Sequence, residues 1–181
     1  MGVNLWGVIH GVRVFVPIML EQDTECHIVN TAAMAGLMSS AYSGVYKATK
    51  HGVVSLSETL YHELALIGAM VNVSILCPGF VNTRIMDCER NRPPELRNDA
   101  AEVMRIKMRP EYQVAEQVMR QELQAGMSYQ QVADCVFNAM REEKFYILTH
   151  PDWKPLVQMR MEDILQERNP TNPFSLLGLQ R

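Results

Sequence analysis

The sequence predicts an α/β fold, namely a partial doubly wound parallel sheet with helices on both faces. Three short apolar runs, residues 27–31, 71–76 and 145–148, are separated by helical stretches. This alternation favours parallel strands joined by right-handed crossovers. The runs are apolar without clean alternation, which is typical of strands covered on both faces. Three strands are few for such a design, which indicates that part of it is absent.

Each strand has a local signature. Residues 27–31 (HIVNT) are β-branched and bounded by polar residues. Residues 71–76 (VNVSIL) run into Cys-Pro-Gly, which is a turn signal. Residues 145–148 (FYIL) form the third expected strand.

The longest expected helix covers residues 43–67, where apolar side chains recur at helical spacing until Gly68 supplies a stop. Further helices are expected at residues 1–21, 111–124, 128–143 and 155–168. Residues 83–110 are polar and contain Pro93 and Pro94, so we expect irregular chain there. The tail from residue 169 has a Pro/Asn-rich loop composition.

The amino-terminal helix has features of a targeting or membrane segment, since residues 5–20 are largely apolar. His10 and Arg13 lie inside that run, Pro17 interrupts it, and no basic residue precedes it. The run is too short and too charged for a bilayer span, and it lacks the basic start of a signal peptide. We therefore expect a buried first helix and no membrane association.

The composition is that of an ordinary globular protein. Of 181 residues, 48% are hydrophobic and 20% charged, which excludes a long disordered tail, a collagen-like repeat and a disulfide-dense mini-protein. A net charge of −3 offers no basic surface for nucleic acid. None of the four cysteines forms a CxxC pair, and reduced thiols in a cytoplasmic protein are the simpler interpretation.

Several common catalytic motifs are absent. The sequence has no GxxxxGK[ST] phosphate loop, no GxGxxG turn and no GxSxG nucleophile elbow. His62-Glu63 begins like a zinc-protease helix, but the residue four positions after His62 is Leu66, so no second ligand faces it. The other histidines are scattered. We expect structural or solvent-facing roles for them and no metal site.

Tyr46 and Lys50 are four residues apart at the start of the longest helix, which places them on one face, a turn apart. An ammonium beside a phenol favours the phenolate and lowers the phenol pKa from about 10 towards neutrality. A phenol tuned in this way can give or take a proton at physiological pH. The spacing alone is common in helices, so its meaning depends on the surrounding sequence.

That surrounding sequence resembles the short-chain dehydrogenase/reductase family. Four pieces match in order and spacing across most of residues 1–150: VNLWG with Asn4, the IVNTAAMAGL loop, YKATK with Tyr46 and Lys50, and PGFVNT from Pro78 to Thr83. The resemblance implies a Rossmann-like sheet, and hydride transfer between NAD or NADP and a carbonyl or alcohol substrate.

The resemblance also implies roles for single residues. Tyr46 would be the general acid/base, and Lys50 would lower its pKa and hold the nicotinamide ribose. Asn4 would position a water that links Lys50 to solvent. The remaining matched residues would lie along the cofactor, namely Pro78, Gly79, Val81 and Thr83. Residues 83–110 would form the variable substrate loop, able to close as a lid.

The sequence departs from the family pattern in two respects. The family usually has a serine thirteen residues before its tyrosine, and here that position is Ala33, which has no hydroxyl to steady the substrate oxygen. The family's Gly-rich turn and its selector residue for NAD or NADP, which supply the pyrophosphate and adenosine sites, have no counterpart in the chain. The resemblance thus favours a truncated protein that lacks the amino-terminal cofactor half.

Two functions follow. The first is an oxidoreductase whose catalytic half covers residues 1–150, with residues 151–181 as the last helix and tail of the same domain. The alternative is a non-catalytic remnant that acts as a binding or dimerisation module. The family commonly dimerises through the helices that correspond to residues 1–21 and 43–67, so we expect a homo-oligomer.

Overall fold

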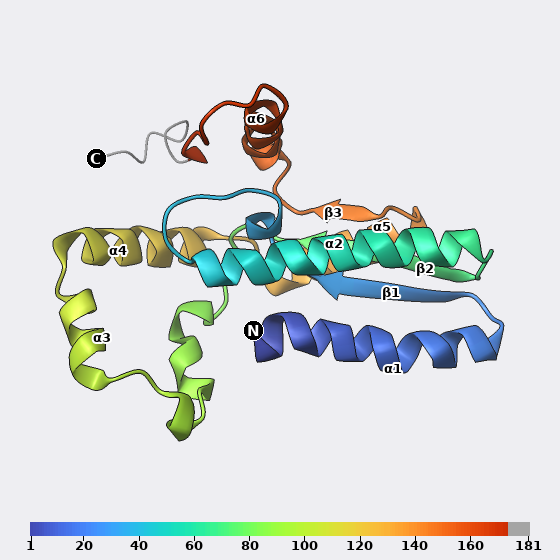
Figure 1. Ribbon diagram of the computed structural model, residues 1–181, viewed down its shortest axis with the longest axis horizontal. Coiled ribbons are helices and arrows are strands. Elements are labelled where there is room, and N and C mark those ends of the chain that lie inside the picture. Colours follow the sequence, from blue (N-terminus) through green and yellow to red (C-terminus); the bar gives the residue numbers. More distant parts are fainter. Residues whose placement is uncertain (174–181) are drawn as a thin grey trace. The chain divides into compact units, whose positions relative to one another are not determined.

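The computed structural model describes residues 1–173 of the chain (Figure 1). Its contacts divide the chain into two compact units. The first joins Met1–Gly79 to the chain from Asp134 onward, and the second is Phe80–Ala133. The expected division at residue 150 stays a prediction, and residues 174–181 of the expected tail lie outside the described residues.

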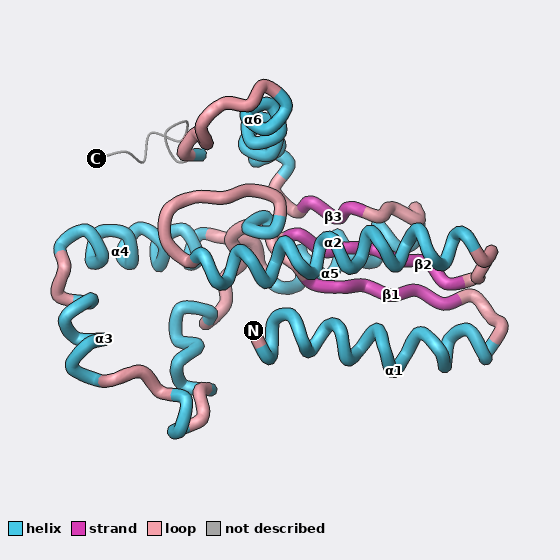
Figure 2. Tube along the Cα trace, in the orientation of Figure 1, coloured by secondary structure: helices cyan, strands magenta, loops and turns pink. Residues whose placement is uncertain are grey.

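The first unit contains a three-stranded parallel sheet in the order β1-β2-β3 (Figure 2). The strands are β1 (Cys26–Thr31), β2 (Val71–Cys77) and β3 (Tyr146–Leu148). The register pairs Thr31 with Leu76 and Ile75 with Tyr146. The α/β class and all three expected strands are confirmed. Six of the seven β2 residues are buried, because β2 has a neighbour on each side.

The expected long helices are present with small shifts at their ends. A π-helical turn, Gly2–Trp6, runs into α1 (Gly7–Gln22), and α2 spans Gly44–Leu66. The last helix that the structure describes, α6 (Lys154–Leu165), ends three residues before the expected end at residue 168. The helix α5 (Tyr129–Arg141) begins in the second unit and ends in the first.

Two apolar clusters form the core of the first unit. One gathers buried residues of α2, the loop after β1, β2 and α6, including Met34, Val53, Ile75 and Leu156. The other joins Leu60 and Leu64 of α2 to Val71 and Val73 of β2. One side of α1 packs partly against both clusters, through Val8 and then through Val12, Val16 and Met19.

The expectation of a buried first helix is wrong. No residue of α1 is buried, and Val14, Phe15 and Ile18 are about half exposed. The sequence shows that the helix is apolar but not how many of its sides are covered. The continuous helix Gly2–Gln22 is also long and apolar enough to cross a membrane, by length and composition alone, with a mean hydropathy of 1.5. The expectation that this segment is too short and too charged is therefore corrected.

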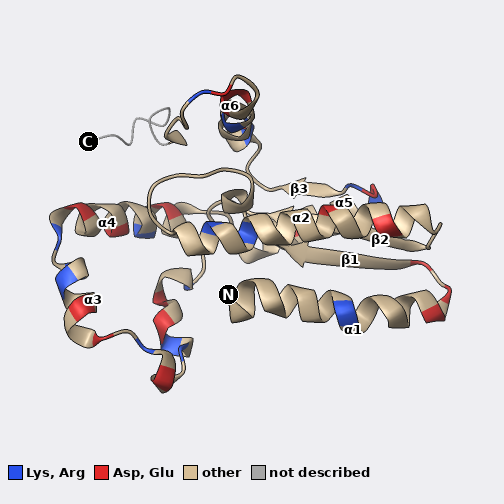
Figure 3. Cartoon of the chain, in the orientation of Figure 1, with Lys and Arg blue, Asp and Glu red and all other residues tan. Residues whose placement is uncertain are grey.

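The second unit is mostly helical, so the expectation of irregular chain over residues 83–110 is also wrong. Its elements are the short 3₁₀ helices Ile85–Asn91 and Pro94–Leu96, then α3 (Ala100–Lys107) and α4 (Pro110–Ala125). Asp99 caps α3 by accepting a hydrogen bond from the Glu102 amide at 2.9 Å. Charged residues are dense along this segment (Figure 3). They pair locally, as Arg120 does with Glu116 at 2.8 Å and Asp87 at 3.3 Å.

Candidate active site

The loop after β1 is held against the end of β2. The Ala32 amide donates to the Leu76 carbonyl at 2.8 Å, and the Met34 amide donates to the Pro78 carbonyl at 2.9 Å. Ala33 lies between them, buried and fully extended, so the position of the family's serine holds a buried methyl group.

The Ala33 backbone amide also hydrogen-bonds the Cys77 thiol, whose burial raises its pKa to about 12. The thiol is therefore protonated at neutral pH. Cys77 and Ala33 together form a neutral, closely packed floor at the carboxyl end of the sheet.

Gly36 brings this loop into contact with α2. A Cβ atom at Gly36 would lie 2.7 Å from the backbone oxygen of Lys50, so no larger residue fits without moving the helix. The close approach places the second turn of α2 beside the end of β1. There the Lys50 ammonium donates a hydrogen bond to the Thr31 carbonyl at 3.1 Å.

The start of α2 is built on an unusual turn. Tyr42 and Ser43 both adopt the left-handed conformation, which is uncommon for residues other than glycine. The Lys47 ammonium gathers the carbonyls of the preceding residues, donating to Ser40 at 2.9 Å, Ala41 at 3.2 Å and Tyr42 at 2.7 Å. These hydrogen bonds compensate the backbone strain and fix the place where Tyr46 enters the helix.

Tyr46 and Lys50 form the expected pair. Both side chains are partly buried, and the Lys50 nitrogen lies 5.8 Å from the centre of the Tyr46 ring. Burial raises the pKa of Tyr46 and lowers the pKa of Lys50. The expectation of a Tyr46 pKa lowered towards neutrality is therefore wrong for this structure, because the phenol loses hydration on burial. The Lys50 ammonium donates to the Thr31 carbonyl.

Asn4 lies in the amino-terminal π-helical turn and is half-buried. The side chain of the next residue, Leu5, packs on α2 so closely that a Cβ atom at Gly52 would lie 3.1 Å from it. Asn4 thus belongs to the segment that packs on α2 just beyond Lys50.

The remaining expected site residues are divided between the two units. Pro78 and Gly79 end the first unit directly after β2. Val81 and Thr83 belong to the second unit, in which Val81 forms an isolated parallel bridge with Met127 and Thr83 is exposed. The geometry therefore brings together Ala33, Tyr46 and Lys50 at the carboxyl ends of β1 and β2.

Sequence reasoning missed three contributors. Lys47 holds the turn before Tyr46, and the Thr31 carbonyl holds Lys50. The third is His150, whose Nδ1 atom accepts a hydrogen bond from the Gly79 amide at 3.2 Å. His150 follows the third strand closely, and the carboxyl ends of parallel strands meet at one edge, which was a usable signal. Within residues 1–173, no three His, Cys, Asp or Glu side chains converge to hold a metal ion.

Comparison with known proteins agrees with this geometry. The family model for short chain dehydrogenases matches residues 1–93. The chain is 29% identical over 170 residues to a CLA biosynthesis dehydrogenase/reductase from Lactiplantibacillus plantarum, covering 94% of this chain and 58% of that protein.

Solved structures give the same result. A short-chain dehydrogenase/reductase from Burkholderia phymatum in complex with NAD is 48% identical, with a TM-score of 0.86 over 95% of this chain and 59% of that one. A putative short-chain dehydrogenase from Novosphingobium aromaticivorans is 28% identical, with a TM-score of 0.64 over 95% of this chain and 51% of that one. The chain thus spans between about half and three fifths of the length of these relatives.

Three findings agree, namely the parallel sheet, the Tyr46–Lys50 pair on α2 and the family match over residues 1–93. This chain therefore belongs to the short-chain dehydrogenase/reductase family of oxidoreductases.

Proposed function

We propose that this chain carries the proton-transfer half of an NAD- or NADP-dependent oxidoreductase that interconverts a carbonyl and an alcohol. The observation that supports this most directly is the Tyr46–Lys50 pair, partly buried and fixed to the end of β1 by the Lys50–Thr31 hydrogen bond. When bound, the nicotinamide would supply or accept the hydride. Tyr46 would give its proton to the substrate oxygen in reduction and take it back in oxidation.

The residues present suit the nicotinamide end of such a cofactor. An ammonium has three N–H donors, and Lys50 uses one on the Thr31 carbonyl. The others suit the hydroxyl groups of a ribose. Gly79 adds a stretch of backbone without a side chain at the end of β2, where family resemblance places the nicotinamide.

Burial raises the pKa of Tyr46, so the phenol is protonated at neutral pH. That is the form that would give a proton to the substrate oxygen in carbonyl reduction.

Ala33 weakens the site. The buried methyl cannot donate a hydrogen bond to the developing oxyanion, and loss of one such donor costs roughly 10²–10³ in rate elsewhere. This observation favours the second candidate, a non-catalytic member that acts as a binding or dimerisation module. Under either function, we propose a homo-oligomer through the segments 1–21 and 43–67, in the cytoplasm, with no nucleic acid or membrane partner.

The test of catalysis is Tyr46→Phe, assayed with NADH and NADPH and a simple carbonyl compound in a preparation that reduces it. Loss of the proton donor should lower kcat by roughly 10²–10⁴. Tyr61→Phe is the matched control, because Tyr61 lies exposed on the same helix. A Tyr46→Phe variant that keeps most of its activity would exclude Tyr46 as the proton donor.

A second test separates the chain from the longer proteins it resembles. We propose that residues 1–181 alone bind NADH and NADPH weakly, because most of the contacts to such cofactors come from a Gly-rich turn and an acidic or basic selector residue. Calorimetric titration measures this directly. Micromolar binding by a monomer would show that the chain holds a complete cofactor site, and the proposal of a missing half would be withdrawn.

A further inference from the structure

The turn after β2 is fastened to the end of β3 by two side chains. The Gly79 amide donates to the Thr149 hydroxyl oxygen at 3.3 Å and to the His150 Nδ1 atom at 3.2 Å. The Thr149 hydroxyl and His150 Nδ1 are themselves 2.8 Å apart. Thr149 is buried and His150 is half-buried, so the three groups form one local network.

The Gly79 amide donates to the Nδ1 atom of His150, which accepts through its single in-plane lone pair. In that arrangement the ring proton is on Nε2. The Trp153 ring lies beside the His150 ring, with the two ring centres 5.5 Å apart, and limits the movement of the imidazole.

The same ring explains why position 79 has no side chain. A Cβ atom there would lie 2.7 Å from both Cγ and Nδ1 of His150, closer than such contacts occur in proteins. The backbone of Gly79 does not adopt the left-handed conformation that would call for glycine. Space, and not backbone freedom, therefore excludes larger residues at this position.

We propose that Thr149 and His150 are positioning residues that fix the Pro78–Gly79 turn by hydrogen bonds and by ring contact. The proposal deepens the proposed function and rests on it for its consequence, since that turn is the backbone expected to face the nicotinamide. Misplacement of a binding group by about 1 Å can cost about 10²-fold in rate. The pair would thus set cofactor geometry from the two residues that follow β3, outside the matched family pieces.

The test is a double-mutant cycle on thermal unfolding of the 181-residue chain, which needs no activity. Gly79→Ala should lower Tm by about 5 °C, because its methyl overlaps the ring. His150→Ala should lower Tm by about 3 °C through lost contacts. The double variant should match His150→Ala alone, because the methyl then has room. Shifts that simply add would overturn the proposal.

Gly36→Ala is the matched control. Its methyl would meet the Lys50 backbone oxygen at the same 2.7 Å, and no side-chain deletion at position 150 can relieve that overlap. Combining Gly36→Ala with His150→Ala should therefore give additive losses. Rescue of Gly36→Ala as well would show that His150→Ala acts through general loosening and would also overturn the proposal.

A second measurement covers the case in which Gly79→Ala does not fold. Thr149→Val removes the hydroxyl at constant shape, whereas Thr149→Ser keeps it. Hydrogen exchange of the peptide around residue 79 should become at least several-fold faster in Thr149→Val and stay near the original rate in Thr149→Ser. Unchanged exchange in both variants would contradict the proposal.

Steady-state kinetics of an active preparation then test whether the Pro78–Gly79 turn affects cofactor binding. Thr149→Val should raise KM for the nicotinamide cofactor several-fold more than it lowers kcat, and Thr149→Ser should restore it. KM could stay unchanged while the unfolding cycle shows coupling between positions 79 and 150. That result would reject the proposed function of the turn and leave the Thr149–His150 contact established.

Discussion

The two long helices of the first unit, α1 and α2, pack against the same apolar clusters yet differ in how far they are covered. In α2 six residues are buried, among them Val53, which has no exposed surface. In α1 none is buried. The difference lies in their neighbours, because α2 is also contacted by the loop after β1 and by the amino-terminal turn.

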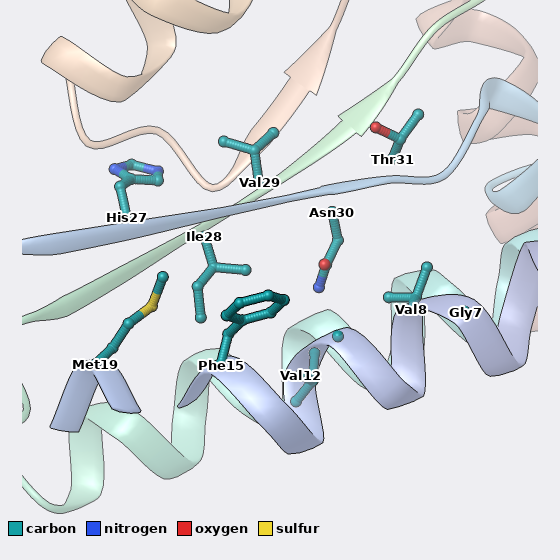
Figure 4. Close-up of a pocket in the computed structure, with 11 residues that line it drawn as sticks. Gly7, Val8, Val12, Phe15, Met19, His27, Ile28, Val29, Asn30 and Thr31 are labelled. Carbon is teal, nitrogen blue, oxygen red and sulfur yellow. The ribbon is translucent and has the colours of Figure 1, made fainter. Parts of the chain in front are cut away.

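An open groove of about 450 Å³ runs between α1 and β1, bordered by the packed side of α1 and by Phe15. Figure 4 shows Ile28 and Asn30 directed from β1 towards α1, and Phe15 and Met19 directed from α1 towards the strand. One edge of β1 is paired with β2 over six residues, while the described chain places no strand on the other edge. The fold is therefore closed where Tyr46 and Lys50 lie and open along the far edge of β1.

The largest expected effect contrasts one valine from each helix. Val53→Ala should lower the free energy of unfolding by about 2 kcal/mol or more, because it opens a cavity in a closed core. Val14→Ala removes the same atoms from a residue that is 54% exposed, and should change it by less than about 0.5 kcal/mol. Urea denaturation of both variants measures the difference. Equal losses would mean that the outer side of α1 is buried in solution, and the comparison would not hold.

At the closed end of the sheet, the next effect is catalytic. Ala33→Ser returns a hydroxyl to the position that the family uses for its donor, and kcat/KM should rise by about tenfold, or ~1.4 kcal/mol of barrier. The gain stays below the full effect of such a donor because the floor around Ala33 and Cys77 is closely packed. Steady-state kinetics beside Tyr46→Phe check this. No gain with Tyr46 still essential would mean that another group already stabilises the oxyanion.

The sequence predicts well what depends on local pattern. The three strands and α2 were recognisable because β-branched runs, helical spacing and Gly68 act over a few residues. The Tyr46–Lys50 pair followed from the spacing of the two residues and from family resemblance. Properties that depend on neighbours were not predictable, such as the open side of α1 and the sign of the Tyr46 pKa shift.

Two further failures have similar causes. Residues 83–110 look irregular because Pro93 and Pro94 interrupt them, yet short helices form on either side, helped by the Asp99 cap. His150 carries no sequence pattern of its own. Only the parallel order of the strands brings it to Gly79, 71 positions away in the chain.

A smaller effect concerns the pH titration of Tyr46. Its pKa is raised by burial, so the fold favours the protonated phenol. This contribution to stability is present below the ordinary value near 10 and is lost as the pH rises through the raised value. Phenolate absorbance of the chain minus that of Tyr46→Phe should therefore give a midpoint above 10.

Lys50→Met provides the control for that titration. Without the ammonium the Tyr46 midpoint should move further upward, because only desolvation remains. A midpoint below 10 in the original chain would show that the ammonium outweighs burial. The Tyr46 pKa would then be lowered, as expected from the sequence.

The smallest change in stability is expected at the groove between α1 and β1. Phe15 is 57% exposed and lines the groove beside the free edge of β1. An apolar groove next to an unpaired strand edge invites association of copies of the chain. Phe15→Gln should alter the free energy of unfolding by less than about 0.5 kcal/mol while clearly reducing self-association in light scattering.

Phe137→Gln distinguishes association through this groove from association through any exposed aromatic surface. Phe137 is 60% exposed on α5 and does not line the groove. If the free edge of β1 drives association, Phe137→Gln leaves the scattering unchanged while Phe15→Gln lowers it. Equal reductions by both variants would assign association to exposed aromatic surface in general. If the unsubstituted chain stays monomeric, the groove between α1 and β1 is stable without a partner. The main physical reason to expect a neighbouring strand there would then be removed.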